Sequence, residues 1–280
     1  MKPYNIVLPL VLGTISENLI RTGIMMASAL KAKLSFLYVI SPSQYSGYAG
    51  TGAVMATAAL SNTKEQKELV QDHYMQILER NKDIISTDIA IERMVIEGPW
   101  VSGIIEYSEK YRPDLLILKH EGHKLIDKIL GDANTELINA VGIPVMVIPE
   151  KADGSLPKKV AYLTDHRQKD INALKQLSIL CKSIDAKIHV VHVGEDDFES
   201  VVKKKGFESI LGEEIRDCKF SYDSILRDHL TENVHVLIEE KGFDLLVMLN
   251  ESENFLNRFF SRSSVDKLMN SVEIPLTIYN

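Results

Sequence analysis

Two short stretches, PDLLILK at residues 113–119 and FDLLVML at residues 243–249, decide how this chain folds. In each, an aspartate precedes a run of apolar residues, and Asp114 and Asp244 stand 130 positions apart. A short apolar run without alternation is typical of a strand that is buried on both faces of a sheet. The recurrence predicts that one structural unit occurs twice in the chain.

Three more pairs of stretches support a duplication. GIPVMVIP (142–149) resembles EIPLTIYN (273–280), KAKLSFLYVI (31–40) resembles IDAKIHVVHV (184–193), and YNIVLPL (4–10) resembles KVAYLTD (159–165). Four matched segments in the same order indicate a tandem repeat. We therefore expect a first domain at 1–150, a linker rich in charge, Gly and Pro at 151–158, and a second domain at 159–280.

Within each half, the apolar runs alternate with segments of helical period. In the first half, helices are expected around residues 17–32, 63–84 and 100–111. Strands that are apolar on both faces and alternate with helices predict an α/β fold, here two tandem open parallel sheets of the Rossmann-like kind. In such sheets ligands bind at the carboxyl ends of the strands.

Composition excludes several classes of protein. The 280 residues are 45% hydrophobic and carry a formal net charge of −7, which argues against a nucleic-acid partner or an anionic membrane surface. No apolar run is long enough to span a bilayer, and the first residues lack a clean signal-peptide pattern. Only Cys181 and Cys218 are present, without metal spacing, so we expect a cytoplasmic protein.

This layout of strands and helices resembles the universal stress protein A family in its tandem two-domain form. The resemblance covers nearly the whole chain and implies an adenine nucleotide alpha hydrolase-like fold, cytoplasmic and commonly dimeric. It implies that the two halves pair through their last strands as an intramolecular pseudo-dimer, which covers exposed sheet edges. A further homodimer and an unknown protein or small-molecule partner remain open.

One branch of that family binds ATP through G-x-x-G, nine residues, then G followed by Ser or Thr. Glycines let backbone N–H groups approach phosphates. In the first half, Lys119 replaces the first glycine, Gly122 matches the second, and Gly131 follows after eight residues with Asp132 in place of the hydroxyl residue. The resemblance therefore places a degenerate phosphate cradle at this loop.

The second half has lost other parts of the same motif. Ser252 stands at the second glycine position, and Arg262, Ser263 and Ser264 follow where the last glycine and hydroxyl residue belong. These three residues either hold a small anion or begin a capped helix. The acidic residue with which the family's first strand ends, and which contacts the nucleoside, matches Asp165 in this half and Leu10 in the first.

Two histidines, His120 and His123, raise a metal site as the weaker alternative. Their spacing is not one helical turn, and two exposed loop histidines are more often polar surface. Neither a nucleophile elbow nor a paired-carboxylate motif occurs, and Asp165 beside His166 is a weak lead because adjacent strand-end residues diverge. We expect no enzyme and no catalytic residues.

The sequence leaves three functions to compare. The leading one is a non-catalytic stress-response protein that acts by binding, with nucleotide binding lost or weakened and no cofactor. The second is an ATP-binding or slowly ATP-hydrolysing switch that uses mainly the second half, and the third is a metal- or small-ligand-responsive module. Residues 41–60 are rich in small residues and have no counterpart in the second half; we expect either a lid or partner surface, or a disordered insertion.

Overall fold

A computed structural model describes residues 4–40, 63–120, 127–194, 198–215, 218–226, 230–250 and 273–280. The chain divides into two compact units. The first contains residues 1–119, 128–145 and 153–155, and the second contains residues 120–127, 146–152 and 156–280. The domain limits expected from the sequence stay a prediction.

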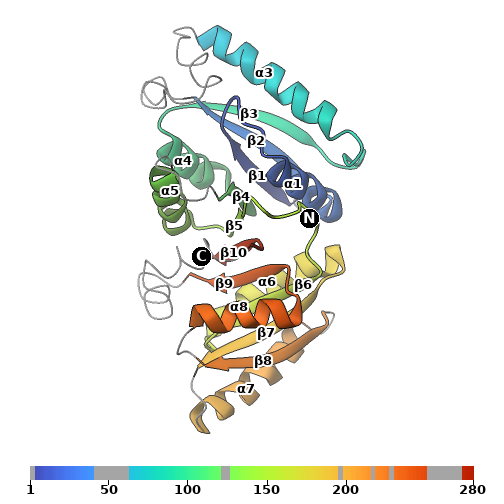
Figure 1. The fold of residues 1–280 in the computed structure, drawn as a ribbon, viewed down its shortest axis with the longest axis vertical. Helices are drawn as coiled ribbons and strands as arrows, with labels where there is room; N and C mark the ends of the chain where they lie inside the picture. Colours follow the sequence, from blue (N-terminus) through green and yellow to red (C-terminus); the bar gives the residue numbers. More distant parts are fainter. Residues whose placement is uncertain are drawn as a thin grey trace. The chain divides into compact units, whose positions relative to one another are not determined.

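The first half alternates strands and helices as predicted (Figure 1). Lys31, in the left-handed conformation, ends the first helix two residues earlier than the sequence suggested, and the second helix ends at Arg80 rather than near residue 84. The elements are β1 (Asn5–Leu10), α1 (Glu17–Leu30), β2 (Lys33–Ile40), α3 (Thr63–Arg80), β3 (Ile91–Glu97), α4 (Trp100–Tyr111), β4 (Leu115–Lys119), α5 (Asp127–Ala140) and β5 (Val145–Ile148).

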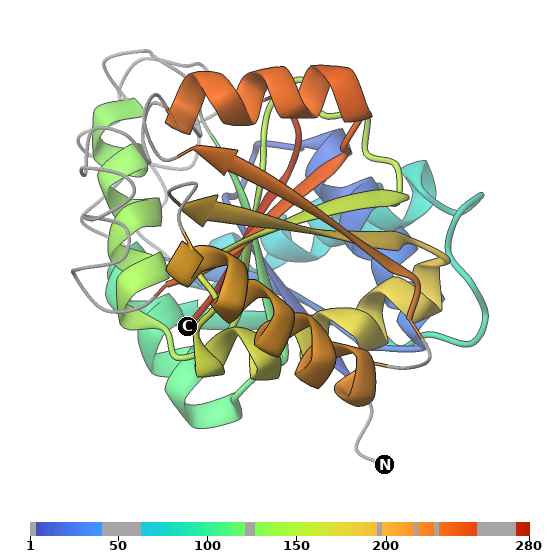
Figure 2. The same cartoon turned by 90° about the horizontal axis from the view of Figure 1, so that it is seen from below.

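The second half repeats this pattern, and Figure 2 shows α8 on one side of its strands and α7 on the other. The elements are β6 (Lys159–Thr164), α6 (Gln168–Ile184), β7 (Lys187–Gly194), α7 (Phe198–Glu214), β8 (Phe220–Leu226), α8 (Leu230–Lys241), β9 (Leu245–Leu249) and β10 (Leu276–Tyr279).

Both halves build a parallel sheet with the same strand order. The order is β3-β2-β1-β4 in the first half and β8-β7-β6-β9 in the second, with β10 beside β9. Central strands are buried on both faces, as the continuous apolar runs predicted. The predicted fold class is therefore confirmed, and the carboxyl ends of β6 and β7 become the natural place to look for a site.

Asp114 and Asp244, the aspartates that precede the two repeated apolar runs, make the same hydrogen bonds in their two halves. Asp114 N–H donates to the carbonyl of Asn5 at 2.8 Å, and the Asp114 carboxylate accepts the N–H of Asn5 at 2.7 Å. Asp244 makes the same pair of contacts with Lys159, at 3.0 and 2.8 Å. Each aspartate thus ties the start of its strand to the start of the first strand of the same half.

This repeated pair of hydrogen bonds, called the aspartate clamp below, corrects the predicted alignment of the first strands by one residue. Because Asn5 matches Lys159, Thr164 stands where Leu10 stands in the first half. The residue that follows is Asp165 in one half and Val11 in the other, so the first-half counterpart of Asp165 is Val11 and not Leu10.

The second strands also need a correction of one residue, in the opposite direction. Lys33 pairs with Asn5 as Lys187 pairs with Lys159, so β2 and β7 match from these two lysines onward. The preceding helices end alike, at Lys31 (φ 50°) and Asp185 (φ 52°), both in the left-handed conformation.

Candidate functional site

A three-residue loop follows β6 in the second unit. Thr164 ends β6 and Gln168 begins α6, so Asp165, His166 and Arg167 make the whole turn. His166 lies in the left-handed region at φ 66°, which is uncommon for a residue with a side chain. The loop leaves the carboxyl end of the strand, where parallel sheets bind ligands.

Asp170, in the first turn of α6, fastens this loop to the sheet. Its carboxylate accepts three hydrogen bonds: from the Tyr162 hydroxyl at 2.7 Å, the Thr164 hydroxyl at 2.7 Å and the Arg167 backbone N–H at 2.9 Å. Asp170 is almost fully buried, and this burial raises its pKa although the hydrogen bonds oppose the shift. The Thr164 hydroxyl also accepts the backbone N–H of His166 at 2.8 Å.

Asp165, the residue expected to contact a nucleoside, is paired within its own loop. Arg167 Nε donates to Asp165 Oδ2 at 2.7 Å, and the two side chains are 28% and 14% exposed. The other oxygen, Oδ1, is buried without a hydrogen-bond partner in the described part of the chain. Arg167 therefore balances the charge of the Asp165 carboxylate, while the Oδ1 atom accepts no hydrogen bond within the described residues.

The side chain of His166 fills the space above the strand ends with aromatic contacts. Its ring stacks on His192 of β7, with centroids 3.9 Å apart and planes 13° apart. Phe207 of α7 lies 5.1 Å away, and Tyr222 of β8 lies 5.7 Å away with its hydroxyl in contact with His166 Nε2. Lys204 Nζ sits 4.7 Å from the centre of the Tyr222 ring, a cation–π distance.

Gly194, the last residue of β7, makes room for His192. A Cβ at this position would lie 2.3 Å from His192 Nε2, so any side chain would push the imidazole away. His192 Nδ1 lies 3.3 Å from the carbonyl of Thr164, which holds the ring over the end of β6. The glycine is therefore part of the arrangement that places the stack.

The first unit fills the corresponding place with another ring pair. Tyr38 occupies the position of His192, and its hydroxyl lies 2.9 Å from His73 Nδ1 on α3, with the rings edge to face at 5.6 Å. Burial lowers the pKa of His73, which keeps its imidazole neutral near pH 7. Val11, 37% exposed, stands where the second unit has Asp165.

Some of the residues expected to hold phosphate or metal lie within the described part of the chain. The Lys119 carbonyl accepts a hydrogen bond from Asn134 Nδ2 at 3.0 Å, and Gly131 lies within helix α5. His120 is only 9% exposed, and its backbone N–H donates to Ile148, so the expectation of an exposed loop histidine was wrong. In the described residues, no three His, Cys, Asp or Glu side chains gather as a metal site would require.

The remaining expectations lie outside the described residues. They concern Gly122 and His123 in the first half, the segment 41–60, and Ser252, Arg262, Ser263 and Ser264 in the second half.

Sequence reasoning missed the partners of His166. Tyr222 and His192 share a face of the sheet by the two-residue period, a signal that could have been read once β7 and β8 were paired in register. The contact of His166 with these two residues depends on its own left-handed conformation. Glycine is the usual sequence signal for this conformation, and the loop contains none.

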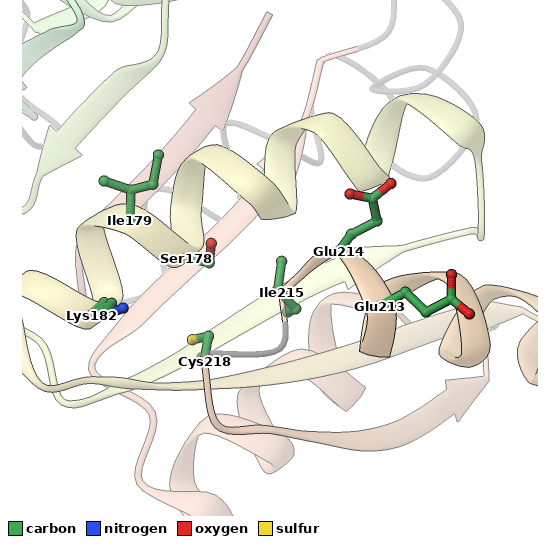
Figure 3. Close-up of a pocket in the computed structure, with 7 residues that line it drawn as sticks. All are labelled: Ser178, Ile179, Lys182, Glu213, Glu214, Ile215 and Cys218. Atoms are coloured by element: carbon green, nitrogen blue, oxygen red, sulfur yellow. The ribbon is translucent and has the colours of Figure 1, made fainter. Parts of the chain in front are cut away.

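A groove of this unit lies between α6 and α7 (Figure 3). Its volume is about 420 Å³, and one edge carries an ion pair between Lys175 and Glu214 at 2.7 Å. Burial raises the pKa of the Cys218 thiol, so this cysteine is not an activated nucleophile. The groove is lined by Ser178, Ile179, Lys182, Glu213, Glu214, Ile215 and Cys218.

Comparison with known proteins gives a consistent result. A model of the universal stress protein family matches residues 3–149. Among solved structures, a universal stress protein from Archaeoglobus fulgidus DSM 4304 is 15% identical with a TM-score of 0.70, covering 99% of this chain and 96% of its own. A functionally unknown protein from Pseudomonas aeruginosa PAO1 is 11% identical with a TM-score of 0.60, covering 99% and 92%.

The cytoplasmic domain of a prokaryotic cation chloride cotransporter also shares the fold. It is 9% identical with a TM-score of 0.53, and the match covers 99% of this chain and 95% of that one. No curated protein matches the sequence. Within the described residues, no helix has both the length and the apolar character needed to cross a membrane.

Proposed function

The chain belongs to the universal stress protein family, and we propose that it serves the stress response by binding a partner, without catalysis and with nucleotide binding lost or weakened. The observation that carries this proposal is the His166 stack. The ring of His166 occupies the carboxyl end of the sheet, where a ligand of such a fold would bind.

A planar base entering this place would have to displace His166 from three aromatic neighbours. An aromatic pair contributes about 0.5–1.5 kcal/mol beyond the area that it buries, so losing several contacts opposes binding by a few kcal/mol. The second unit is therefore closed by its own side chain. In the first unit, Tyr38 and His73 take the corresponding place.

The charges of the loop support the same proposal. Asp165, the residue expected to contact a nucleoside, is bound to Arg167 at 2.7 Å. A ligand that used both carboxylate oxygens would have to break this ion pair. The residues at the expected phosphate-binding positions also support a loss of nucleotide binding, since Lys119 replaces one glycine and Gly131 lies within α5.

The proposal can be tested by removing the ring of His166. His166→Gly deletes the ring and suits a backbone at φ 66°, and Asp185→Gly is the matched control because Asp185 is also left-handed, at φ 52°, at the other end of α6. In calorimetry we expect a heat of ATP·Mg²⁺ binding for His166→Gly, and none for the unaltered chain or for Asp185→Gly. Binding by the unaltered chain at micromolar Kd would refute the proposal.

A second candidate is an ATP-binding switch that uses the second unit. It is favoured by the buried Oδ1 of Asp165, an acceptor with no partner in the described residues. In this case Asp165→Ala and Arg262→Ala would each abolish a nucleotide binding that the unaltered chain shows. Unchanged binding in both variants would remove this candidate.

The predicted association of the two halves through their last strands stays a prediction, as does any further homodimer. Size measurement by light scattering across a range of concentrations would separate a single chain from a dimer.

A further inference from the structure

The strand β3 lies at an edge of the first unit's sheet. Among the described strands it pairs only with β2, in continuous register along its whole length, and none of its residues is buried. Helices contact both of its faces: Arg93 donates to Gln71 of α3 on one, and Ile96 lies against Gly103 of α4 on the other. The outer edge is therefore the part of β3 left open. An edge of this kind is a template for another strand.

Two hydrogen bonds to β2 show which backbone groups of β3 face outward. The N–H of Leu34 donates to the carbonyl of Ala90 at 2.8 Å, and the N–H of Gly98 donates to the carbonyl of Ile40 at 2.9 Å. Successive residues of a strand point their N–H and C=O groups to opposite sides. The even-numbered residues of β3 therefore face β2, and the odd-numbered residues face outward.

The outward-facing groups lie mainly in the second half of the strand. At its start, the carbonyl of Ile91 accepts a hydrogen bond from the Tyr74 hydroxyl of α3 at 3.2 Å. Beyond this point, Arg93, Val95 and Glu97 present their N–H and C=O groups outward. Proline, which would protect such an edge, does not occur in β3.

The charges of β3 suit pairing with a second copy of the same strand. When two copies lie antiparallel with Val95 opposite Val95, the outward-facing groups meet, and each Arg93 stands opposite the Glu97 of the other copy. Opposite charges in this position stabilise a strand pair, and like charges destabilise it. A register centred on Met94 places Ile91 opposite Glu97, and one centred on Arg93 places two arginines opposite each other.

The two charged side chains lie on the same face of β3, toward α3. Arg93 contacts Gln71 there, and Glu97 lies 3.7 Å from Lys67. The Glu97 side chain is 57% exposed, so it is accessible to a second copy. In the second unit, the edge strand β8 carries a single charged residue, Asp223, so no pairing of β8 with itself brings opposite charges together.

We propose that the outer edge of β3 binds a second copy of this chain. The two strands run antiparallel, with Val95 opposite Val95 and Arg93 paired with Glu97 in both directions, and each facing pair of outward residues exchanges two backbone hydrogen bonds. This surface belongs to the first unit, and the proposal does not depend on the strand-end site of the second unit. It gives a homodimer a defined interface.

The experiment measures the mass of the full chain by light scattering from about 5 to about 500 µM. Val95→Pro removes an outward N–H, a change that an edge strand tolerates. Ser224→Pro is the matched control, because the carbonyl of Lys219 accepts the N–H of Ile188, and Ser224 therefore faces outward on β8. We expect the unaltered chain to reach twice the mass of one chain, Val95→Pro to raise the dimer Kd at least tenfold, and Ser224→Pro to keep it within twofold.

Exchanging the charges tests the register. Arg93→Glu and Glu97→Arg each place like charges opposite each other in both pairs, so each should raise the Kd at least tenfold. The double variant restores opposite charges, and its Kd should return to within threefold of the unaltered value.

Three outcomes would overturn the proposal: a single chain at every concentration, a dimer whose Kd Val95→Pro leaves unchanged, or a double charge variant as weak as the single ones. A dimer formed through the last strands or through the second unit would give the second outcome. Far-ultraviolet circular dichroism confirms the fold of each variant, and the charge variants decide the question if Val95→Pro does not fold.

Discussion

Replacing Asp170 by alanine should destabilise the second unit, because this one carboxylate satisfies three donors. The hydroxyls of Tyr162 and Thr164, both buried, lose their acceptor, and each unsatisfied group costs about 1–3 kcal/mol. The loss of the bond to the Arg167 N–H, a helix-capping interaction, costs about 1 kcal/mol.

A part of this loss is returned because the variant no longer buries a carboxylate, whose raised pKa shows that burial is unfavourable to its charged form. Together these contributions lead us to expect that Asp170→Ala lowers the free energy of unfolding by about 3 kcal/mol. Urea unfolding followed by circular dichroism measures this change.

A double-mutant cycle with Tyr162→Phe tests the reason for the loss. In the unaltered chain, removing the Tyr162 hydroxyl should destabilise by about 1.5–3 kcal/mol, because it breaks a hydrogen bond to a charged group. In the Asp170→Ala background the same substitution removes a stranded hydroxyl, so it should be neutral or stabilising. Two additive single-mutant effects would contradict the network described here.

Three further predictions follow from single positions. Gly194→Ala should displace the His192 ring and destabilise by about 1–3 kcal/mol, as a thermal melt with a matched Gly206→Ala control would show, since a Cβ at Gly206 meets no atom within 4 Å. Burial lowers the pKa of His73 in the folded state, so the unfolded chain binds its proton more tightly and stability is lost as pH falls below about 6.5, by up to about 1.4 kcal/mol per pH unit. His73→Gln should flatten this part of the stability profile, and an unchanged slope would contradict it. Asp185→Gly, at φ 52°, should raise the free energy of unfolding by up to about 1 kcal/mol, and a loss of stability in urea would contradict this.

The fold could be predicted from the sequence because strands that are buried on both faces require continuous runs of apolar residues. The apolar runs after Asp114 and Asp244 are strands buried on both faces, and the order of the repeated segments carries the duplication. The alignment of the first strands was one residue off, since apolar residues on both faces give no marker of register. The aspartate clamp that Asp114 and Asp244 form with Asn5 and Lys159 supplies this marker only in three dimensions.

The site was harder to predict because its contacts join distant residues. Asp165 was predicted as the last residue of the first strand of its half and is the first residue after it, and its ion pair with Arg167 depends on the turn of the chain between them. His166 was a weak lead because adjacent residues at a strand end diverge, and they do: Asp165 meets Arg167 while His166 meets His192. The sequence distance from His166 to Tyr222, 56 residues, is invisible to any local pattern.

The central claim is that the second unit's strand ends are occupied by the chain's own ring. A crystal structure of the unaltered protein grown at neutral pH with millimolar ATP and magnesium tests it most directly. We predict that His166 remains stacked on His192, that Asp165 remains paired with Arg167, and that no nucleotide density lies between them. A nucleotide bound at the end of β6, with His166 swung away from His192, would contradict the account.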